Sequence, residues 1–96
     1  MTLVTALVLM NVQRAKVDDV AQRLLELEGV DEVFSVAGQY DAVALLRTKT
    51  NEQIAELVTH KITEIPFITN TQTLMAFKAF SRDDMGKMFS IGNEAE

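Results

Sequence analysis

The chain has 96 residues, 48% of them hydrophobic and 24% charged, which is typical of one globular domain and not of a disordered segment. A net charge of −5 opposes direct binding to nucleic-acid phosphates and to anionic membrane surfaces. The chain has no cysteine, which excludes disulfides, thiolate metal sites and cysteine nucleophiles. This composition fits a reducing cytoplasm, where we expect the protein to work.

The N-terminal stretch, residues 3–12, is expected to form a buried strand because apolar residues fill both of its alternating positions. It lacks the basic start and the small-residue cleavage site of an export signal, and it is too short to cross a bilayer as a helix. A strand that is apolar on both faces indicates a sheet covered on both sides. Helices can form one cover, and a second subunit is the simplest candidate for the other.

The pattern then changes to a helical period over residues 17–28, with acidic residues in the first turn and Gly29 suited to the C-terminal end. Alternating runs follow at residues 30–37 and 41–48. The link between them, residues 38–40, contains a glycine, so the two runs predict a β-hairpin.

Thr50 and Gln53 have the spacing of a capping box and predict the start of a second helix. That helix should end near Ile65, because Pro66 disfavours helix in the residue before it. Residues 68–80 are rich in threonine and then aromatic, which predicts a long fourth strand. For residues 81–96, a short helix, a partner-contacting arm and a loose tail are all open interpretations.

The resulting order is β-α-β followed by β-α-β, which predicts an α+β fold of the ferredoxin-like βαββαβ type over residues 1–80. Its four-stranded antiparallel sheet would carry both helices on one face. The other face would then be bare, yet the strands are apolar on both sides. We therefore expect dimerisation through the sheet, either face to face or edge to edge.

Catalytic and metal-binding patterns are absent from the sequence. His60 is the only histidine, and no second histidine or carboxylate is recognised as its partner, so a solvated helix residue is expected. Asp18, Asp19, Glu26 and Glu28 are expected on an exposed helix face, and Asp83, Asp84, Glu94 and Glu96 lie in the C-terminal segment. No phosphate-binding glycine motif occurs. We therefore expect no cofactor, no metal and no catalytic residue.

The hairpin link has two possible interpretations. Gly38 can adopt a positive φ and allows close approach to the backbone, while Gln39, Tyr40 and Asp41 present an amide, a phenol and a carboxylate. Backbone N–H groups of a tight turn can bind a carboxylate, and Asp41 could accept from an ammonium group, which together suit a free amino acid. The same residues are also ordinary turn formers.

The fourth strand carries Thr69, Thr71 and Thr73 at alternating positions, so their hydroxyl groups are expected on one face. They could line a polar pocket or form a β-favourable surface stripe.

These segments resemble the effector-binding domain of the leucine-responsive/asparagine-responsive regulator family (Lrp/AsnC). The resemblance is carried by LEGVDEVFSVAGQYDAVALLR at 27–47, by ITNTQTLMAF at 68–77 and by the helix spacing between them. It implies a dimer with a dimeric α/β-barrel-type association, in which the sheets face one another, and often a ring of dimers. It also implies a free amino acid as effector, bound between dimers.

By position, the resemblance assigns ligand binding to Gly38, Gln39, Tyr40, Asp41, Thr71 and Thr73. The two threonines are implied as contributions from a neighbouring chain. Full-length members of the family begin with a DNA-binding domain, whereas this sequence starts at the first effector-domain strand. We therefore expect a stand-alone module with no direct contact to nucleic acid or membrane.

The leading hypothesis is an amino-acid-binding and oligomerisation module that modulates transcriptional regulation of amino-acid metabolism, in which a full-length regulator of the same family is a possible partner. Two alternatives remain at this stage. One is a small dimeric ferredoxin-like enzyme of the monooxygenase or isomerase type, which would need a cavity lined with polar groups between helices and sheet. The other is a purely structural assembly domain.

Overall fold

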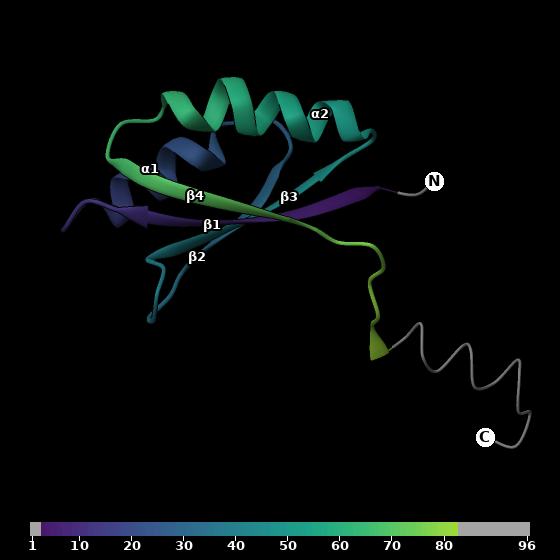
Figure 1. Cartoon of the computed structure of the whole chain (residues 1–96), viewed down its shortest axis with the longest axis horizontal. Helices are drawn as coiled ribbons and strands as arrows, with labels where there is room; N and C mark the ends of the chain where they lie inside the picture. Colours follow the sequence, from purple (N-terminus) through teal and green to yellow (C-terminus); the bar gives the residue numbers. More distant parts are fainter. Residues whose placement is uncertain (1–2, 83–96) are drawn as a thin grey trace, which may run out of the picture.

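The computed structural model describes residues 3–82. In chain order its elements are β1 (Val4–Val12), α1 (Val17–Leu25), β2 (Val30–Ser35), β3 (Ala42–Thr48), α2 (Asn51–Glu56) and β4 (Ile68–Met75). After Glu56 the second helix continues as a π-helical turn over Leu57–Lys61 and a 3₁₀ turn over Ile62–Glu64. The strands form one antiparallel sheet in the order β2-β3-β1-β4, with both helices on one face (Figure 1). The predicted ferredoxin-like arrangement is confirmed.

The two central strands bury alternate residues under the helices. Ala6, Val8 and Met10 of β1 are fully buried, and each lies opposite a residue of β3 that is also buried. Helix α1 adds Val20 and Leu24 to this core. The remaining buried apolar residues are Val12, Ala42, Ala44, Leu46, Ile54, Leu57 and Ile62. Because the core is formed by β1, β3 and the helices, both edge strands are left with partly exposed faces.

The helix-free face of the sheet, here called the open face, is apolar in its middle. One cross-strand row joins Leu74, Leu7 and Leu45, and the next joins Leu9 to Val43. Leu7, Leu9, Val43 and Leu45 are half-buried, while Phe34 at the β2 edge and Leu74 at the β4 edge are 45% and 44% exposed. A contiguous apolar surface of this kind on a sheet is typical of an interface with another chain.

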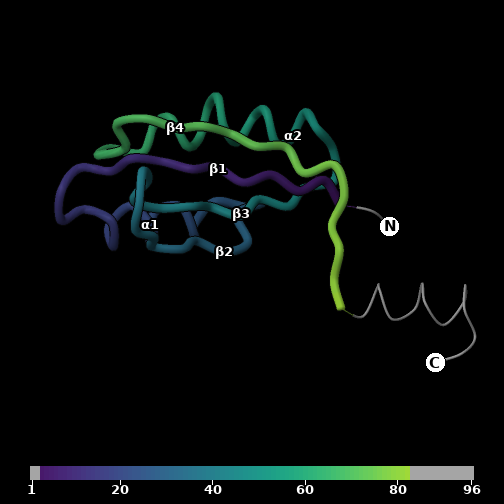
Figure 2. The backbone as a smooth tube through the Cα atoms, turned by 60° about the horizontal axis from the view of Figure 1, so that its bottom comes forward, coloured from purple at the N-terminus to yellow at the C-terminus, as the bar shows by residue number. Residues whose placement is uncertain are grey.

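The fourth strand ends at Met75, so the prediction that it extends to Phe80 is wrong. Its partner β1 begins at Val4, and Met75 already pairs with Ala6, so the ladder ends close to the beginning of β1. A last backbone bond from Ala76 N–H to Thr5 C=O measures 3.0 Å. Residues 76–82, here called the arm, then leave the sheet (Figures 1 and 2). Residues 83–96 of the predicted C-terminal segment lie outside the described part.

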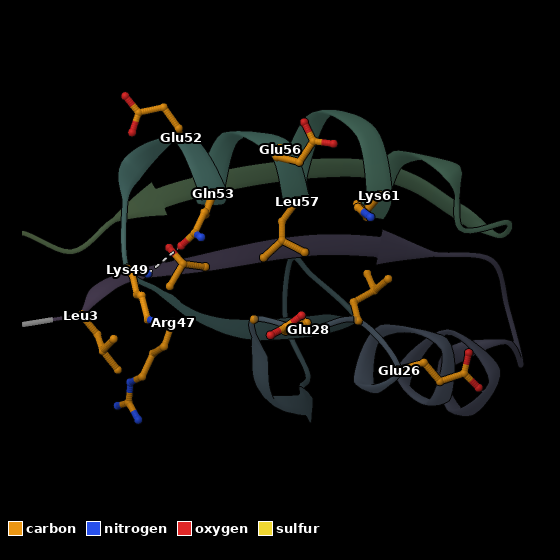
Figure 3. A pocket seen from close by; sticks show the side chains of 13 residues that line it. Leu3, Glu26, Glu28, Arg47, Lys49, Glu52, Gln53, Glu56, Leu57 and Lys61 are labelled. Atoms are coloured by element: carbon orange, nitrogen blue, oxygen red, sulfur yellow. Dashed lines mark hydrogen bonds between the residues drawn. The ribbon is translucent and has the colours of Figure 1, made fainter.

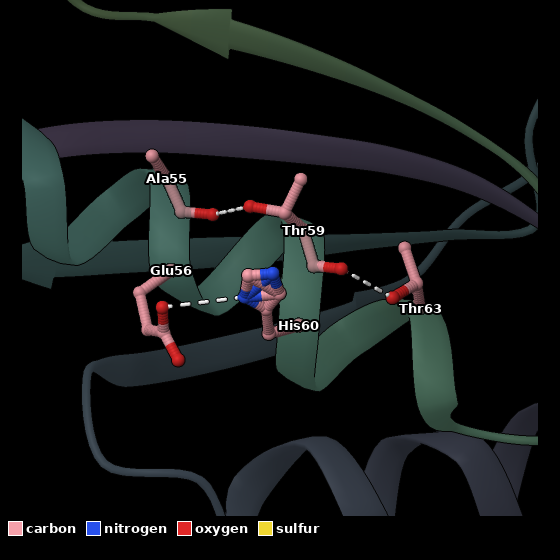
Figure 4. A network of polar contacts seen from close by, with 5 residues as sticks. All are labelled: Ala55, Glu56, Thr59, His60 and Thr63. Carbon is pink, nitrogen blue, oxygen red and sulfur yellow. Dashed lines mark hydrogen bonds and ion pairs between the residues drawn. The ribbon is translucent and has the colours of Figure 1, made fainter.

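The second helix starts as predicted and ends at Glu64, beside the predicted end at Ile65, but its last turns are π-helical and 3₁₀. Thr50 Oγ1 accepts from Gln53 N–H at 3.2 Å, and Gln53 Oε1 accepts from Thr50 N–H at 3.3 Å, which confirms the capping box. The π-helical turn coincides with hydroxyl groups that bond back to the helix (Figure 4): Thr59 donates to Ala55 C=O, and Thr63 donates to Thr59 C=O. Threonine bonds of this kind compete with the regular helical ladder.

The first helix is shorter than predicted, because α1 ends at Leu25 and the chain reaches β2 through a turn at Gly29. Gly29 has φ +101°, and a Cβ there would lie 2.7 Å from Leu57 Cδ1. Glycine therefore allows the turn after α1 to approach the second helix closely.

Candidate functional site

Asp41, the last residue before β3, anchors the hairpin link to the end of β1. Its Oδ2 accepts from Val12 N–H at 2.8 Å, and its own N–H donates to Met10 C=O at 2.9 Å. Its carbonyl accepts from Val36 N–H at 3.0 Å, which closes the link over residues 36–41. The Asp41 side chain thus has a structural role that the sequence did not reveal. Within residues 3–82 its second oxygen, Oδ1, makes no hydrogen bond.

Tyr40 and Gln39 tie the link to the open face of the sheet. The Tyr40 hydroxyl donates a short hydrogen bond to Gln72 Oε1 on β4, and Asn11 Nδ2 donates to Gln39 C=O at 2.8 Å. Because Gln72 lies opposite Leu9, these contacts are on the helix-free side. The hairpin link therefore reaches across the end of β1 as far as β4.

Gly38 lies at the exposed tip of the link. Its φ is +129°, a conformation that favours glycine, and apart from its own and its chain neighbours' atoms nothing lies within 4 Å of the place that a Cβ would occupy. The N–H groups of Gly38, Gln39 and Tyr40 donate to no acceptor within the described part of the chain. The tip therefore offers several unused backbone donors next to open space.

Thr71 and Thr73 lie on the other face of β4. They pair with Met10 and Val8, whose side chains are fully buried under the helices, so both threonines face the helix side and are half-buried there. The structure brings the four hairpin residues together and separates them from the two threonines of the same chain. A contribution of the threonines from a neighbouring chain stays a prediction.

The expected threonine stripe is interrupted at Thr69. The register between β1 and β4 shifts between Asn11 and Val12, so Asn70 pairs with Asn11 whereas Ile68 pairs with Val12. Thr69 lies in this bulge, where its Oγ1 donates to Asn11 C=O at 3.3 Å. The alternation that places Thr71 and Thr73 on one face does not extend to Thr69.

Three polar residues on the open face were missed as members of the site. Asn11 contacts the hairpin link, and Asn70 Nδ2 donates to Asn11 Oδ1 at 3.3 Å. Gln72 accepts from Tyr40. The available signal was Asn11 itself, a lone amide in an otherwise apolar strand. The link and these three side chains form the candidate effector site.

A hollow of about 670 Å³ lies between the end of α1 and the second helix (Figure 3). Leu27, Gly29, Thr48 and Leu57 contribute to it, and its charged lining residues are all exposed: Glu26, Glu28, Arg47, Lys49, Glu52, Glu56 and Lys61. Arg47 is held by Asp31 at 2.9 Å.

A second hollow of about 810 Å³, here called the edge groove, lies between α2 and the free edge of β4. Most of its lining is apolar, and it ends at the start of the arm. The lining residues are Leu3, Val4, Asn51, Ile54, Ala55, Val58, Thr59, Thr73, Met75, Ala76 and Phe77.

His60 is exposed, as predicted, but it has a carboxylate neighbour that was missed. Its Nδ1 lies 3.3 Å from Glu56 Oε1 one helical turn earlier (Figure 4). Residues 3–82 contain no group of three or more His, Cys, Asp or Glu side chains placed to hold a metal ion. No helix in the same range is long and apolar enough to cross a membrane.

Residues 5–85 match the family model described as the Lrp/AsnC ligand binding domain. The chain therefore belongs to the Lrp/AsnC family. Among curated proteins it is 33% identical over 73 residues to the HTH-type transcriptional regulator FL11 of Pyrococcus abyssi, covering 76% of this chain and 48% of that protein. It is 27% identical over 77 residues to the uncharacterised HTH-type transcriptional regulator YugG of Bacillus subtilis, covering 80% of this chain and 45% of YugG. The chain thus spans about half the length of these relatives.

One solved structure matches this chain over almost the whole length of the solved protein. TTHA0845 from Thermus thermophilus is 39% identical with a TM-score of 0.76, and the match covers 82% of this chain and 99% of TTHA0845. Neisseria meningitidis regulator NMB0573, solved as a complex with L-Met, is 15% identical with a TM-score of 0.73 over 82% of this chain and 53% of NMB0573. At that identity the second match shows the common fold alone.

Proposed function

We propose that the chain binds a free amino acid at the hairpin link and, through that binding, modulates transcriptional regulation of amino-acid metabolism. The observation that carries the proposal is the position of the link, which lies inside the matched ligand-binding domain and has an open tip with unused donors. The structure of NMB0573 with L-Met motivates the choice of an amino acid as ligand class. The curated relatives are transcriptional regulators, which argues against the enzyme alternative.

The link offers complementary groups for the two charged ends of an amino acid. Backbone N–H groups from Gly38 to Tyr40 would bind the carboxylate, as such groups do in other tight turns. Asp41 Oδ1 would accept from the ammonium group while Oδ2 keeps its bond to Val12. Tyr40 and Gln39 would contact the remainder of the ligand. Thr71 and Thr73 of a neighbouring chain would complete the site.

The open face would form a homodimer in which two sheets face one another. Its central leucine and valine residues are only half-buried in a single chain, and packing a second sheet about 10 Å away would cover them. Further contacts between dimers would build a ring. A full-length relative is a possible further partner. That the module works without a DNA-binding domain of its own stays a prediction, which the mass of the native protein would test.

Calorimetric titration of the purified protein with each of the twenty amino acids tests the proposal. We expect one amino acid, or a few related ones, to bind with one site per chain. Asp19→Asn is a matched control, since it removes a partly exposed α1 carboxylate whose Oδ2 lies 3.6 Å from Arg23 Nε. Asp19→Asn should bind as the unchanged protein does, and Asp41→Asn should bind more weakly. If no amino acid binds at millimolar concentration, the proposal is wrong and the structural assembly domain takes its place.

A further inference from the structure

We propose that Asn70 and Gln72 contact the side chain of the effector and select an amino acid with a primary carboxamide, glutamine or asparagine. This inference rests on the proposed binding of an amino acid at the hairpin link, and it narrows the ligand class to one side-chain chemistry. The observation behind it is a pair of amide side chains beside the link, each of which keeps one polar atom without a hydrogen bond in the described part of the chain.

The part of the open face next to the link is lined by uncharged polar groups. Asn11 of β1 and Asn70 and Gln72 of β4 supply three amide side chains. From the link, the carbonyl of Gln39 and the hydroxyl of Tyr40 bond to two of them. None of these five side chains is charged at neutral pH, so a charged effector side chain would find no counter-ion among them.

The hydrogen bonds that the two β4 amides already make determine which of their atoms stay available. Gln72 Oε1 accepts from the Tyr40 hydroxyl, whereas Gln72 Nε2 makes no hydrogen bond within residues 3–82. Asn70 Nδ2 donates to Asn11 Oδ1 at 3.3 Å, whereas Asn70 Oδ1 accepts from no donor in the same range. A free donor and a free acceptor therefore lie next to each other on β4.

The spacing of this pair suits a carboxamide. Asn70 and Gln72 are two residues apart on one strand, so their side chains leave the same face about 7 Å apart. Both side chains are exposed in the single chain and can be reached by a ligand. A carboxamide combines an accepting oxygen and two donating hydrogens in one planar group. Between the two side chains, its oxygen would accept from Gln72 Nε2 and its NH2 group would donate to Asn70 Oδ1.

Other effector side chains would leave one or both of these atoms unpaired. Leucine offers neither a donor nor an acceptor, and methionine offers only a weakly accepting sulfur. A carboxylate, as in glutamate, can accept from Gln72 Nε2 but cannot donate to Asn70 Oδ1. Because a ligand that covers a polar atom without pairing it loses affinity, the two amides discriminate against all of these side chains.

Calorimetric titration with matched pairs of amino acids tests the assignment. Glutamine and methionine have unbranched side chains of similar length, and asparagine and leucine form a second pair of similar shape. We expect the wild-type protein to bind glutamine or asparagine roughly tenfold to a hundredfold more tightly than its apolar counterpart. Equal affinity within both pairs, or tighter binding of methionine or leucine, would overturn the assignment.

The same titrations separate a failure of this assignment from a failure of the proposed function. If another amino acid binds best and Asp41→Asn weakens its binding, the link is still the effector site and only the selection of a carboxamide is wrong. If none of the twenty amino acids binds, the proposed function fails together with the selection.

Gln72→Met tests the contact with the effector side chain directly. It keeps the length of the side chain but removes the Nε2 donor and the acceptor of the Tyr40 hydroxyl. A purely structural role of Gln72 would weaken the binding of all amino acids alike, whereas a selecting role lowers the affinity ratio within the preferred pair towards one. Gln22→Met makes the same change on exposed α1 and should leave that ratio at its wild-type value. A wild-type ratio in the Gln72→Met protein would overturn the proposal.

Discussion

Replacing Asp41 by alanine and by asparagine separates the structural role of this side chain from its proposed role in binding. Alanine removes the acceptor of the 2.8 Å bond from Val12 N–H at the end of β1. Asparagine retains an acceptor oxygen at nearly the same place but has no charge. The structural role of Asp41 predicts that the alanine variant is less stable than the asparagine variant. Its proposed contact with the ligand's ammonium group predicts that both variants bind the amino acid more weakly.

The magnitude of each effect follows from the contact. A partly buried backbone N–H that loses a charged acceptor costs about 1.5–3 kcal/mol, which is roughly 10 °C in melting temperature for a domain of this size. Asparagine should recover most of that loss. Removing one charge-assisted bond to the ligand should weaken binding about tenfold to a hundredfold in both variants.

Thermal unfolding at fixed protein concentration and calorimetric titration together give both numbers. We expect Asp41→Asn to melt close to the wild-type protein and to bind the effector weakly. If Asp41→Asn binds with wild-type affinity, Asp41 belongs to the hairpin link alone and the proposed ammonium contact is wrong.

Three further predictions concern the fold and its assembly. Leu7→Glu places a charge in the middle of the open face and should make a face-to-face dimer dissociate in sedimentation, while the circular dichroism of each subunit persists. Gly29→Ala should lower the melting temperature more than Gly38→Ala does. Both substitutions force a strained φ, but only the one at Gly29 adds a contact, at 2.7 Å to Leu57. Equal losses of melting temperature would contradict this geometry. Thr50→Ala removes the cap of α2 and should cost about 1 kcal/mol in urea unfolding, whereas a neutral result would mean that the capping box contributes nothing.

The order of elements could be predicted because each segment follows one clear period. Residues 17–25 repeat like a helix, residues 4–12 and 42–48 are apolar at strand positions, and Thr50 with Gln53 marks a helix start. These signals depend only on residues close together in the sequence, so they can be recognised without knowing which segments pack together in the fold. The same locality explains the error at β4, whose end depends on where its partner β1 begins and not on its own sequence alone.

The candidate site was predictable only in part for a related reason. The turn at Gly38 is local and was recognised, but its contacts to Asn11 and Gln72 depend on how β1, β3 and β4 align. Alternation predicted that Thr71 and Thr73 share a face but could not say which face, because one step of register exchanges the two sides of a strand.

Hydrogen exchange with and without the bound amino acid tests the central claim most directly, because it locates the ligand on the intact assembly. We predict that a saturating effector slows exchange of the amides of residues 36–41, whose donors at Gly38, Gln39 and Tyr40 are otherwise unused in the described part. Amides of residues 49–61, beside the α1–α2 hollow, should exchange as before. Protection of residues 49–61 with none at 36–41 would contradict the account and place the ligand in that hollow.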